Sequence, residues 1–307
     1  LIWFPTGGGK TEAYLACAAF SIFLRRIRNQ DDSGTEVLMR YTLRLLTAQQ
    51  FQRASSLICS MEIIRRQNES LLGIKPFSIG IWVGGETTPN NWPQAVRDLK
   101  NAAYKGSEAY KFVYRQCPWC SAEMGPVPKP GSRSRGYEIR GIFDQAGKLK
   151  IHCPDPECPF HDALPSRIVD EDIYSNPPTY LIATVDKFAS LAWRSEARHI
   201  FGRGLEGELI SSPPGMIIQD ELHLITGPLG SMVGLYEMLI DELCTDTISA
   251  EPVKPVMICA TATTRASSRQ IRELYARSSA SIFPPPALDA SDSFFARYSF
   301  DKEGKLK

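Results

Sequence analysis

The chain has 307 residues, of which 43% are apolar and 22% are charged, and its 35 basic side chains nearly balance 34 acidic ones. This composition excludes an intrinsically disordered chain, and no apolar run approaches the roughly 18 residues that a membrane-spanning helix needs. The net charge of +1 also excludes a uniformly basic surface, so any binding of nucleic acid must come from local patches.

At about 150 residues per domain, the length predicts about two domains. The chain starts at Leu1 without a methionine, and residues 1–4 form an apolar run that leads directly into a glycine-rich turn. Such a start is typical of a buried strand, and it has neither the charged region nor the cleavage site of a signal peptide. We therefore expect both ends to be cuts through a longer protein.

Apolar runs with strand character alternate with helical patterns along the chain. The strand-like runs are residues 1–4, 37–42, 77–83, 180–185, 216–219 and 256–260, and the helical stretches include residues 11–28, 47–66 and 231–244. Continuous apolar runs separated by longer helices are typical of βαβ units, in which helices cover both faces of a parallel sheet. The sequence therefore predicts an α/β fold with a parallel sheet flanked by helices.

The first glycine-rich turn has the pattern of a phosphate-binding loop between a strand and a helix. Its backbone N–H groups can turn toward phosphate oxygens, and the helix N-terminus adds its positive dipole. Lys10 would reach the phosphates, and the Thr11 hydroxyl would bind Mg²⁺. The residues expected to bind nucleotide are Thr6, Gly7, Gly8, Gly9, Lys10 and Thr11. Phe4 stands where the general pattern has glycine, so a plain strand-to-helix turn remains an alternative.

An acidic tetrapeptide follows the apolar run at 216–219. Because ligands collect at the carboxyl ends of parallel strands, Asp220 is expected to hold Mg²⁺ through water, and Glu221 to orient and deprotonate the attacking water. His223 completes the tetrapeptide as a further catalytic candidate. Downstream, Thr261 and Thr263 could hydrogen-bond His223 and couple the site to a neighbouring segment. The alternatives are a surface turn for the acidic residues and a simple cap or turn for the threonines.

Residues 111–166 interrupt the alternating pattern with many prolines and glycines and with four of the eight cysteines. We interpret them as an inserted module between a first part of the α/β domain, residues 1–110, and a second part, residues 167–307. The module contains a basic run at residues 129–150 with Tyr137 among its arginines. This run could contact phosphates and stack on a base, or it could be a solvated surface loop.

The cysteines of the module form two close pairs, Cys117 with Cys120 and Cys153 with Cys158. Two chelating pairs of thiolates complete a tetrahedral Zn²⁺ site with no open position, which favours a structural role. A segment this poor in apolar residues needs such a staple to fold. The alternatives are that His152 or His161 replaces one thiolate, or that the four thiols are free.

The cysteine spacing favours metal over disulfides, and hence a reducing, cytoplasmic compartment. The four remaining cysteines stand singly in apolar segments and are expected to be small buried side chains. They are Cys17, Cys59, Cys244 and Cys259.

In order and spacing, these elements resemble the first RecA-like lobe of superfamily 2 helicases. Pro-Thr-Gly-Gly-Gly-Lys-Thr is similar to motif I, Asp-Glu-Leu-His to a DExH version of motif II, and Ala-Thr-Ala-Thr to motif III. Residues 47–50, 84–85 and 183–187 resemble the motifs that contact nucleic acid. A narrower resemblance, in residues 39–47, 219–236 and 283–286, is to the helicase subunit of DISARM, a bacterial anti-phage defence system.

The resemblance implies ATP and Mg²⁺ as cofactors, DNA that is single-stranded or a duplex with an overhang, and a second defence-system subunit as partner. The nucleic-acid contacts that it implies are Arg44, Gln50, Arg53, Gly84, Gly85 and Thr184. The second RecA-like lobe and the adenine-reading segment are not found in this chain, so we expect it alone to hydrolyse ATP weakly or not at all. An RNA-directed DExH ATPase and a non-hydrolysing, zinc-stapled nucleic-acid adaptor are the alternative functions.

Overall fold

The computed structural model describes residues 2–3, 9–42, 44–131, 136–247, 251–261, 267–278, 280–283, 285 and 298–305. Its centre is a seven-stranded sheet in the order β1-β11-β10-β2-β9-β3-β8, in which every neighbouring pair is parallel. The strands are β1 (Ile2–Trp3), β2 (Val37–Tyr41), β3 (Ile79–Trp82), β8 (Ser166–Arg167), β9 (Tyr180–Thr184), β10 (Met216–Gln219) and β11 (Val256–Thr261). The predicted α/β fold with a parallel sheet flanked by helices is confirmed.

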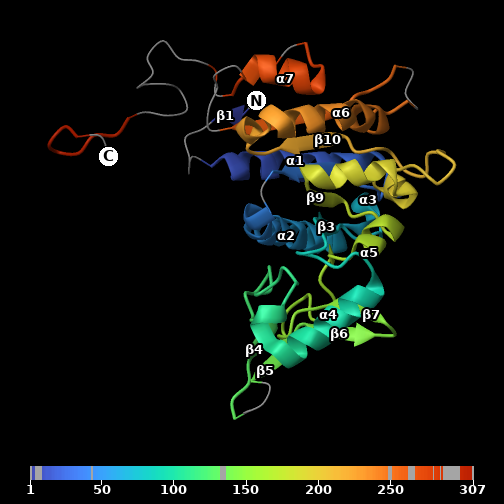
Figure 1. Cartoon of the computed structure of the whole chain (residues 1–307), viewed down its shortest axis with the longest axis vertical. Helices are drawn as coiled ribbons and strands as arrows, with labels where there is room; N and C mark the ends of the chain where they lie inside the picture. Colours follow the sequence, from blue (N-terminus) through green and yellow to red (C-terminus); the bar gives the residue numbers. More distant parts are fainter. Residues whose placement is uncertain are drawn as a thin grey trace.

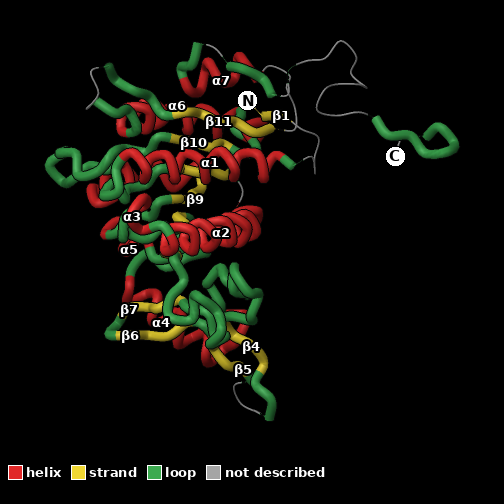
Figure 2. Tube along the Cα trace, turned by 180° about the vertical axis from the view of Figure 1, so that it is seen from behind, coloured by secondary structure: helices red, strands yellow, loops and turns green. Residues whose placement is uncertain are grey.

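Helices cover both faces of this sheet (Figures 1 and 2). The helices are α1 (Lys10–Arg28), α2 (Arg44–Gln67), α3 (Glu69–Leu72), α4 (Trp92–Lys105), α5 (Asp170–Ser175), α6 (Gly227–Leu243) and α7 (Ser267–Tyr275), with short 3-10 segments η1 (Gly106–Ala109), η2 (Val185–Ala192), η3 (Ser195–Phe201) and η4 (Leu222–Leu224). Because side chains alternate along a strand, Met39 of β2 packs with α1 and α2, whereas Leu38 packs with η2, η3 and α6. The central strands β2, β3, β9 and β10 are therefore buried on both faces, which explains their continuous apolar runs.

Helix α1 buries one face against the sheet, and this determines the exposure of Cys17. Tyr14, Ala18 and Ile22 recur every four residues and are buried against the sheet. Cys17 lies off this face and is exposed, so its predicted burial is wrong, whereas Cys59, Cys244 and Cys259 are buried as expected. In the described part of the chain, no helix is both long enough and apolar enough to cross a membrane.

Two small antiparallel sheets lie at one end of the molecule, far from α6 and α7 (Figures 1 and 2). One pairs β4 (Gly125–Pro128) with β5 (Tyr137–Arg140), and the other pairs β6 (Ile142–Gln145) with β7 (Lys148–Ile151). Helix α4 precedes the expected boundary at residue 110, but it packs against β5 and β7. It starts at the Asn91 cap, whose side chain accepts a 2.9 Å hydrogen bond from the Gln94 amide.

Gly106 ends α4 with φ at 74°, a left-handed conformation that favours glycine. The ring of Tyr137 lies directly against Gly106, in the place that any side chain there would need. The Tyr137 ring is thus packed against the backbone at the end of α4, and the side chain is half-buried.

Candidate nucleotide and zinc sites

The carboxyl ends of the parallel strands bring the predicted motifs to one edge of the sheet. β11 lies between β1 and β10, with Ile2 opposite Ala260 and Gln219 opposite Cys259. Asp220 and Thr261 therefore end adjacent strands, and α1 follows the neighbouring strand. Gly9 caps α1 with φ at 84°, and Lys10 and Thr11 form its first turn. Thr6, Gly7, Gly8 and Thr263 lie outside the described residues.

A buried tyrosine hydroxyl joins the two halves of the predicted magnesium site. Tyr14 Oη lies 3.2 Å from Thr11 Oγ1 and 3.2 Å from Asp220 Oδ2, although Tyr14 and Asp220 are 206 positions apart in the chain. A third neighbour, Tyr41 Oη, lies 3.1 Å from Tyr14 Oη. The structure thus places a hydroxyl and a carboxylate, the oxygen ligands that Mg²⁺ prefers, around one point.

Burial and the neighbouring Glu221 charge raise the pKa of Asp220 above its ordinary value. The backbone N–H of Glu221, the Tyr14 hydroxyl and the Lys10 ammonium act in the opposite direction. The Glu221 N–H donates to Asp220 Oδ1 at 2.9 Å, and the Asp220 N–H donates to the carbonyl of Arg40 at 3.1 Å. These contacts hold the carboxylate at the strand end with one oxygen facing Tyr14.

Glu221 has φ at 49°, in the left-handed region that non-glycine residues rarely adopt. Its Oε2 lies 3.3 Å from His223 Nδ1, and the same nitrogen lies 3.3 Å from Thr261 Oγ1. A chain of three polar side chains thus connects the acidic tetrapeptide to the end of β11. Backbone strain of this kind costs about 1–3 kcal/mol and clusters at functional sites.

Tyr14 was not among the residues predicted from the sequence. It lies three positions after Thr11 on a helix, a spacing that places both side chains on the same face. The spacing from Thr11 could have identified Tyr14 as a site residue. However, Tyr14 also fits the apolar face of α1, so the sequence equally predicts an ordinary core residue.

The residues expected to contact nucleic acid lie near the same edge, at the ends of the neighbouring strands β2, β9 and β3. Arg44 is the first residue of α2, and Gln50 and Arg53 follow on that helix. Arg53 is ion-paired with Glu12 at an exposed position, where such a pair is weak and readily exchanged.

Gly84 and Gly85 follow β3, and the Gly84 carbonyl accepts a hydrogen bond of 2.8 Å from the Thr87 amide. Thr184 differs from the other candidates because its side chain is fully buried. Its hydroxyl has no hydrogen-bond partner among the described residues. A contact through this hydroxyl is therefore not open in this structure, since the side chain faces the protein interior.

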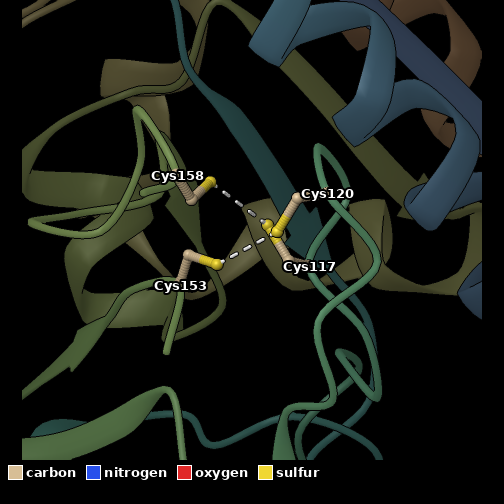
Figure 3. A group of neighbouring side chains, drawn as sticks. All are labelled: Cys117, Cys120, Cys153 and Cys158. Atoms are coloured by element: carbon tan, nitrogen blue, oxygen red, sulfur yellow. Dashed lines mark hydrogen bonds between the residues drawn. The ribbon is translucent and has the colours of Figure 1, made fainter. Parts of the chain in front are cut away.

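The four predicted zinc ligands converge from the two ends of the inserted segment (Figure 3). The Sγ atoms of Cys117, Cys120, Cys153 and Cys158 all lie within 4.8 Å of one another. Cys117 Sγ is 4.0 Å from Cys158 Sγ, and Cys120 Sγ is 3.3 Å from Cys153 Sγ. A tetrahedron with Zn–S bonds of about 2.3 Å has sulfur–sulfur edges of about 3.8 Å. The cluster therefore has the size and donor type that zinc requires.

The surroundings of the thiols differ. Burial raises the pKa of Cys158 to about 11, and it also raises the pKa of Cys153. Burial acts in the same sense on Cys120, but hydrogen bonds with the Ala122 amide and the neighbouring thiols outweigh it and lower the pKa of Cys120. Without a bound cation, Cys153 and Cys158 therefore favour the protonated thiol. A metal ion that binds the cluster would displace these protons, because thiolates are the ligands.

The two histidines proposed as alternative ligands flank Cys153. His152 Nδ1 and His161 Nδ1 lie 3.0 Å and 2.9 Å from the Cys153 carbonyl oxygen. Within the described residues, the group of side chains that could hold a metal ion contains the four cysteines and neither histidine. The geometry therefore favours the four-thiolate set.

The cysteine module rests on α2. Gln52 Nε2 donates to the Gln116 carbonyl at 3.2 Å, Ser56 Oγ to the Pro118 carbonyl at 2.7 Å, and Arg66 Nη1 to the Pro159 carbonyl at 3.2 Å. These carbonyls belong to both cysteine-containing loops. Helix α2 therefore carries the candidate nucleic-acid contacts Arg44, Gln50 and Arg53 and, from Gln52 onward, the contacts with the cysteine module.

Comparison with known proteins gives one relative with clear sequence similarity. No protein-family model matches the chain. Over 97% of its length the chain is 38% identical to DISARM protein DrmA from Bacillus paralicheniformis, of which it covers 29%. Among solved structures it is similar to the DUF1998 helicase MrfA, with 15% identity, a TM-score of 0.44, and coverage of 90% of this chain and 26% of that one. The chain thus spans less than a third of either protein, and its predicted resemblance to a protein of the DISARM system is confirmed by the similarity to DrmA.

Proposed function

We propose that this chain forms the first RecA-like motor lobe of an ATP-dependent DNA helicase or translocase that acts in bacterial anti-phage defence. The single observation that carries the proposal is the convergence of Thr11 and Asp220 on the Tyr14 hydroxyl. A phosphate-binding helix start and an acidic strand end meet there, as ATP hydrolysis requires. The similarity to DrmA supports the defence role.

In the proposed mechanism, Lys10 and the amides at the start of α1 bind the phosphates of ATP. Thr11 and Asp220 fit Mg²⁺, which when bound neutralises charge on the phosphoryl oxygens. Glu221 orients a water and takes its proton, and its contact with His223 keeps the carboxylate at the strand end. Thr261 contacts His223 and thereby couples the position of the His223 side chain to the end of β11.

The proposed lobe consists of residues 1–110 and 167–307, and residues 111–166 form its inserted module. Cys117, Cys120, Cys153 and Cys158 would hold zinc in a structural role, since their four thiols leave no ligand position open for chemistry. The proposed DNA contacts lie at Arg44, Gln50 and Arg53 on α2 and at Gly84 and Gly85 in the loop after β3. A second defence-system subunit is the proposed protein partner.

The direct test compares Glu221→Gln with the unchanged sequence in the protein that carries this chain. The variant should bind nucleotide normally and lose turnover by about 10²–10⁴-fold, the usual contribution of a general base. Glu206→Gln, at an exposed loop position, is the matched control and should leave turnover unchanged. Normal turnover in Glu221→Gln would show that this carboxylate is not the base.

The same assay separates the substrate classes. ATP turnover is measured with single-stranded DNA, with duplex DNA carrying an overhang, and with RNA. Stimulation by either DNA supports the proposal, whereas stimulation by RNA alone contradicts it and favours the RNA-directed ATPase. Binding of nucleic acid without any turnover would favour the adaptor.

A further inference from the structure

We propose that Tyr14 is a positioning residue of the nucleotide site, whose hydroxyl sets the separation of Thr11 and Asp220 for Mg²⁺. This inference rests on the proposed function, because it concerns the metal that accompanies ATP. It assigns a role to a residue that has none in the helicase motifs described above.

The geometry restricts Tyr14 to one orientation. Its side chain is fully buried between α1 and the strand ends. From that position its oxygen lies 3.2 Å from both Thr11 Oγ1 and Asp220 Oδ2. The side chain cannot turn away without opening the core, so its hydroxyl is a fixed point between the two groups.

The available protons determine how this contact works. An ionised carboxylate can only accept hydrogen bonds, and a phenol has one proton. Tyr14 therefore donates to Asp220, and its lone pairs remain open to the hydroxyl hydrogens of Thr11 and Tyr41. This arrangement orients the Thr11 oxygen and the Asp220 carboxylate toward the same point before nucleotide binds.

If Tyr14 had a purely structural role, removing its hydroxyl would have the same effect as removing another buried hydroxyl nearby. Tyr41 provides that comparison. Tyr41 is also buried, and its hydroxyl lies 3.1 Å from that of Tyr14 and 3.7 Å from Met39 Sδ. It belongs to the same hydroxyl cluster but has its contact with Tyr14 and not with either proposed magnesium ligand. Tyr41→Phe is therefore a control for the loss of one buried hydroxyl at this place.

The test measures binding of a fluorescent ADP analogue to the whole chain, first in EDTA and then with increasing Mg²⁺. Tyr14→Phe should leave affinity in EDTA within about twofold and raise the Mg²⁺ concentration at half-saturation about tenfold or more, as expected for losing one hydrogen bond to a charged group. Tyr41→Phe should change the Mg²⁺ requirement by no more than about twofold. Thermal melting checks that both variants are folded.

An unchanged Mg²⁺ requirement in Tyr14→Phe overturns the inference, and so does an equal increase in Tyr41→Phe, which would indicate general packing. If Tyr14→Phe does not fold, Tyr14 alone is replaced by 3-fluorotyrosine, which keeps the hydroxyl, and its ¹⁹F resonance is followed while Mg²⁺ is added to the ADP complex. A change supports the contact, and no change overturns it. If the unchanged chain binds no nucleotide, the proposed function itself fails, a result distinguishable from failure at Tyr14 alone.

Discussion

Arg40 and Glu237 form a buried ion pair next to the proposed nucleotide site. Arg40 Nη1 lies 2.6 Å from Glu237 Oε1, and the two side chains are 1% and 5% exposed. At this distance, with an effective dielectric constant of about 20, their attraction is about 6 kcal/mol. We expect Glu237→Gln to lower the free energy of unfolding by about 3–5 kcal/mol, because it leaves a buried guanidinium without its counter-charge.

The two single variants should differ in their dependence on pH. Arg40 cannot release its proton, so the cost of Glu237→Gln stays constant with pH. In Arg40→Met, the remaining Glu237 can take up a proton, since burial raises its pKa even with Arg40 present. Its folded-state pKa then lies above its unfolded value, so stability falls as pH rises above about 4.3, by up to about 1.4 kcal/mol per pH unit.

The assay is urea denaturation of the unchanged chain, both single variants and the double variant Arg40→Met with Glu237→Leu, at about pH 5 and about pH 8. The double variant should lie within about 1–2 kcal/mol of the unchanged chain, since a well-packed apolar pair can replace a buried ion pair. A loss below about 1 kcal/mol in Glu237→Gln would refute the reasoning. An equal pH dependence of the two single variants would refute the proposed asymmetry.

Replacing Cys117 and Cys120 by serine should abolish bound zinc and destabilise the inserted module, whereas Cys244→Ser, away from the cluster, should retain the metal. Metal analysis checks both, and an unmodified chain without zinc would contradict the site. Burial raises the pKa of Asp170 to about 6 despite its contact with Lys187, so its folded form binds a proton more tightly than the unfolded chain. Stability from this group is therefore greatest below about pH 4 and falls as pH rises to about 6, by up to about 3 kcal/mol. Asp170→Asn should remove this pH dependence of the free energy of unfolding between about pH 4 and 6, as measured by urea denaturation. If the variant and the unchanged chain depend on pH in the same way, the assignment to Asp170 is wrong.

The sequence predicts the sheet well because burial on both faces produces uninterrupted apolar runs. The runs at 37–42 and 180–185 correspond to β2 and β9, which are fully buried. Motif positions follow for the same reason, since the carboxyl ends of parallel strands meet at one edge. Asp220 could thus be assigned to the neighbourhood of Lys10 from two distant segments alone.

Inside the inserted module, the sequence carries little information about structure. β4 to β7 are strands of four residues each; β4 contains two prolines, the others mix apolar with charged residues, and among the described residues each pairs with one neighbour. Their positions depend on the convergence of the four cysteines, which spacing indicates but does not orient. Thr184 illustrates a second limit, because a motif position alone does not reveal that its side chain faces inward.

The inserted module is attached to the α/β domain through contacts with α2. Hydrogen bonds of 2.7–3.2 Å attach both cysteine loops to this helix at Gln52, Ser56 and Arg66. The proposed DNA contacts and the attachments of the inserted module therefore share one helix. If the four cysteines hold zinc as proposed, the metal would fix the two loops whose carbonyls accept hydrogen bonds from α2.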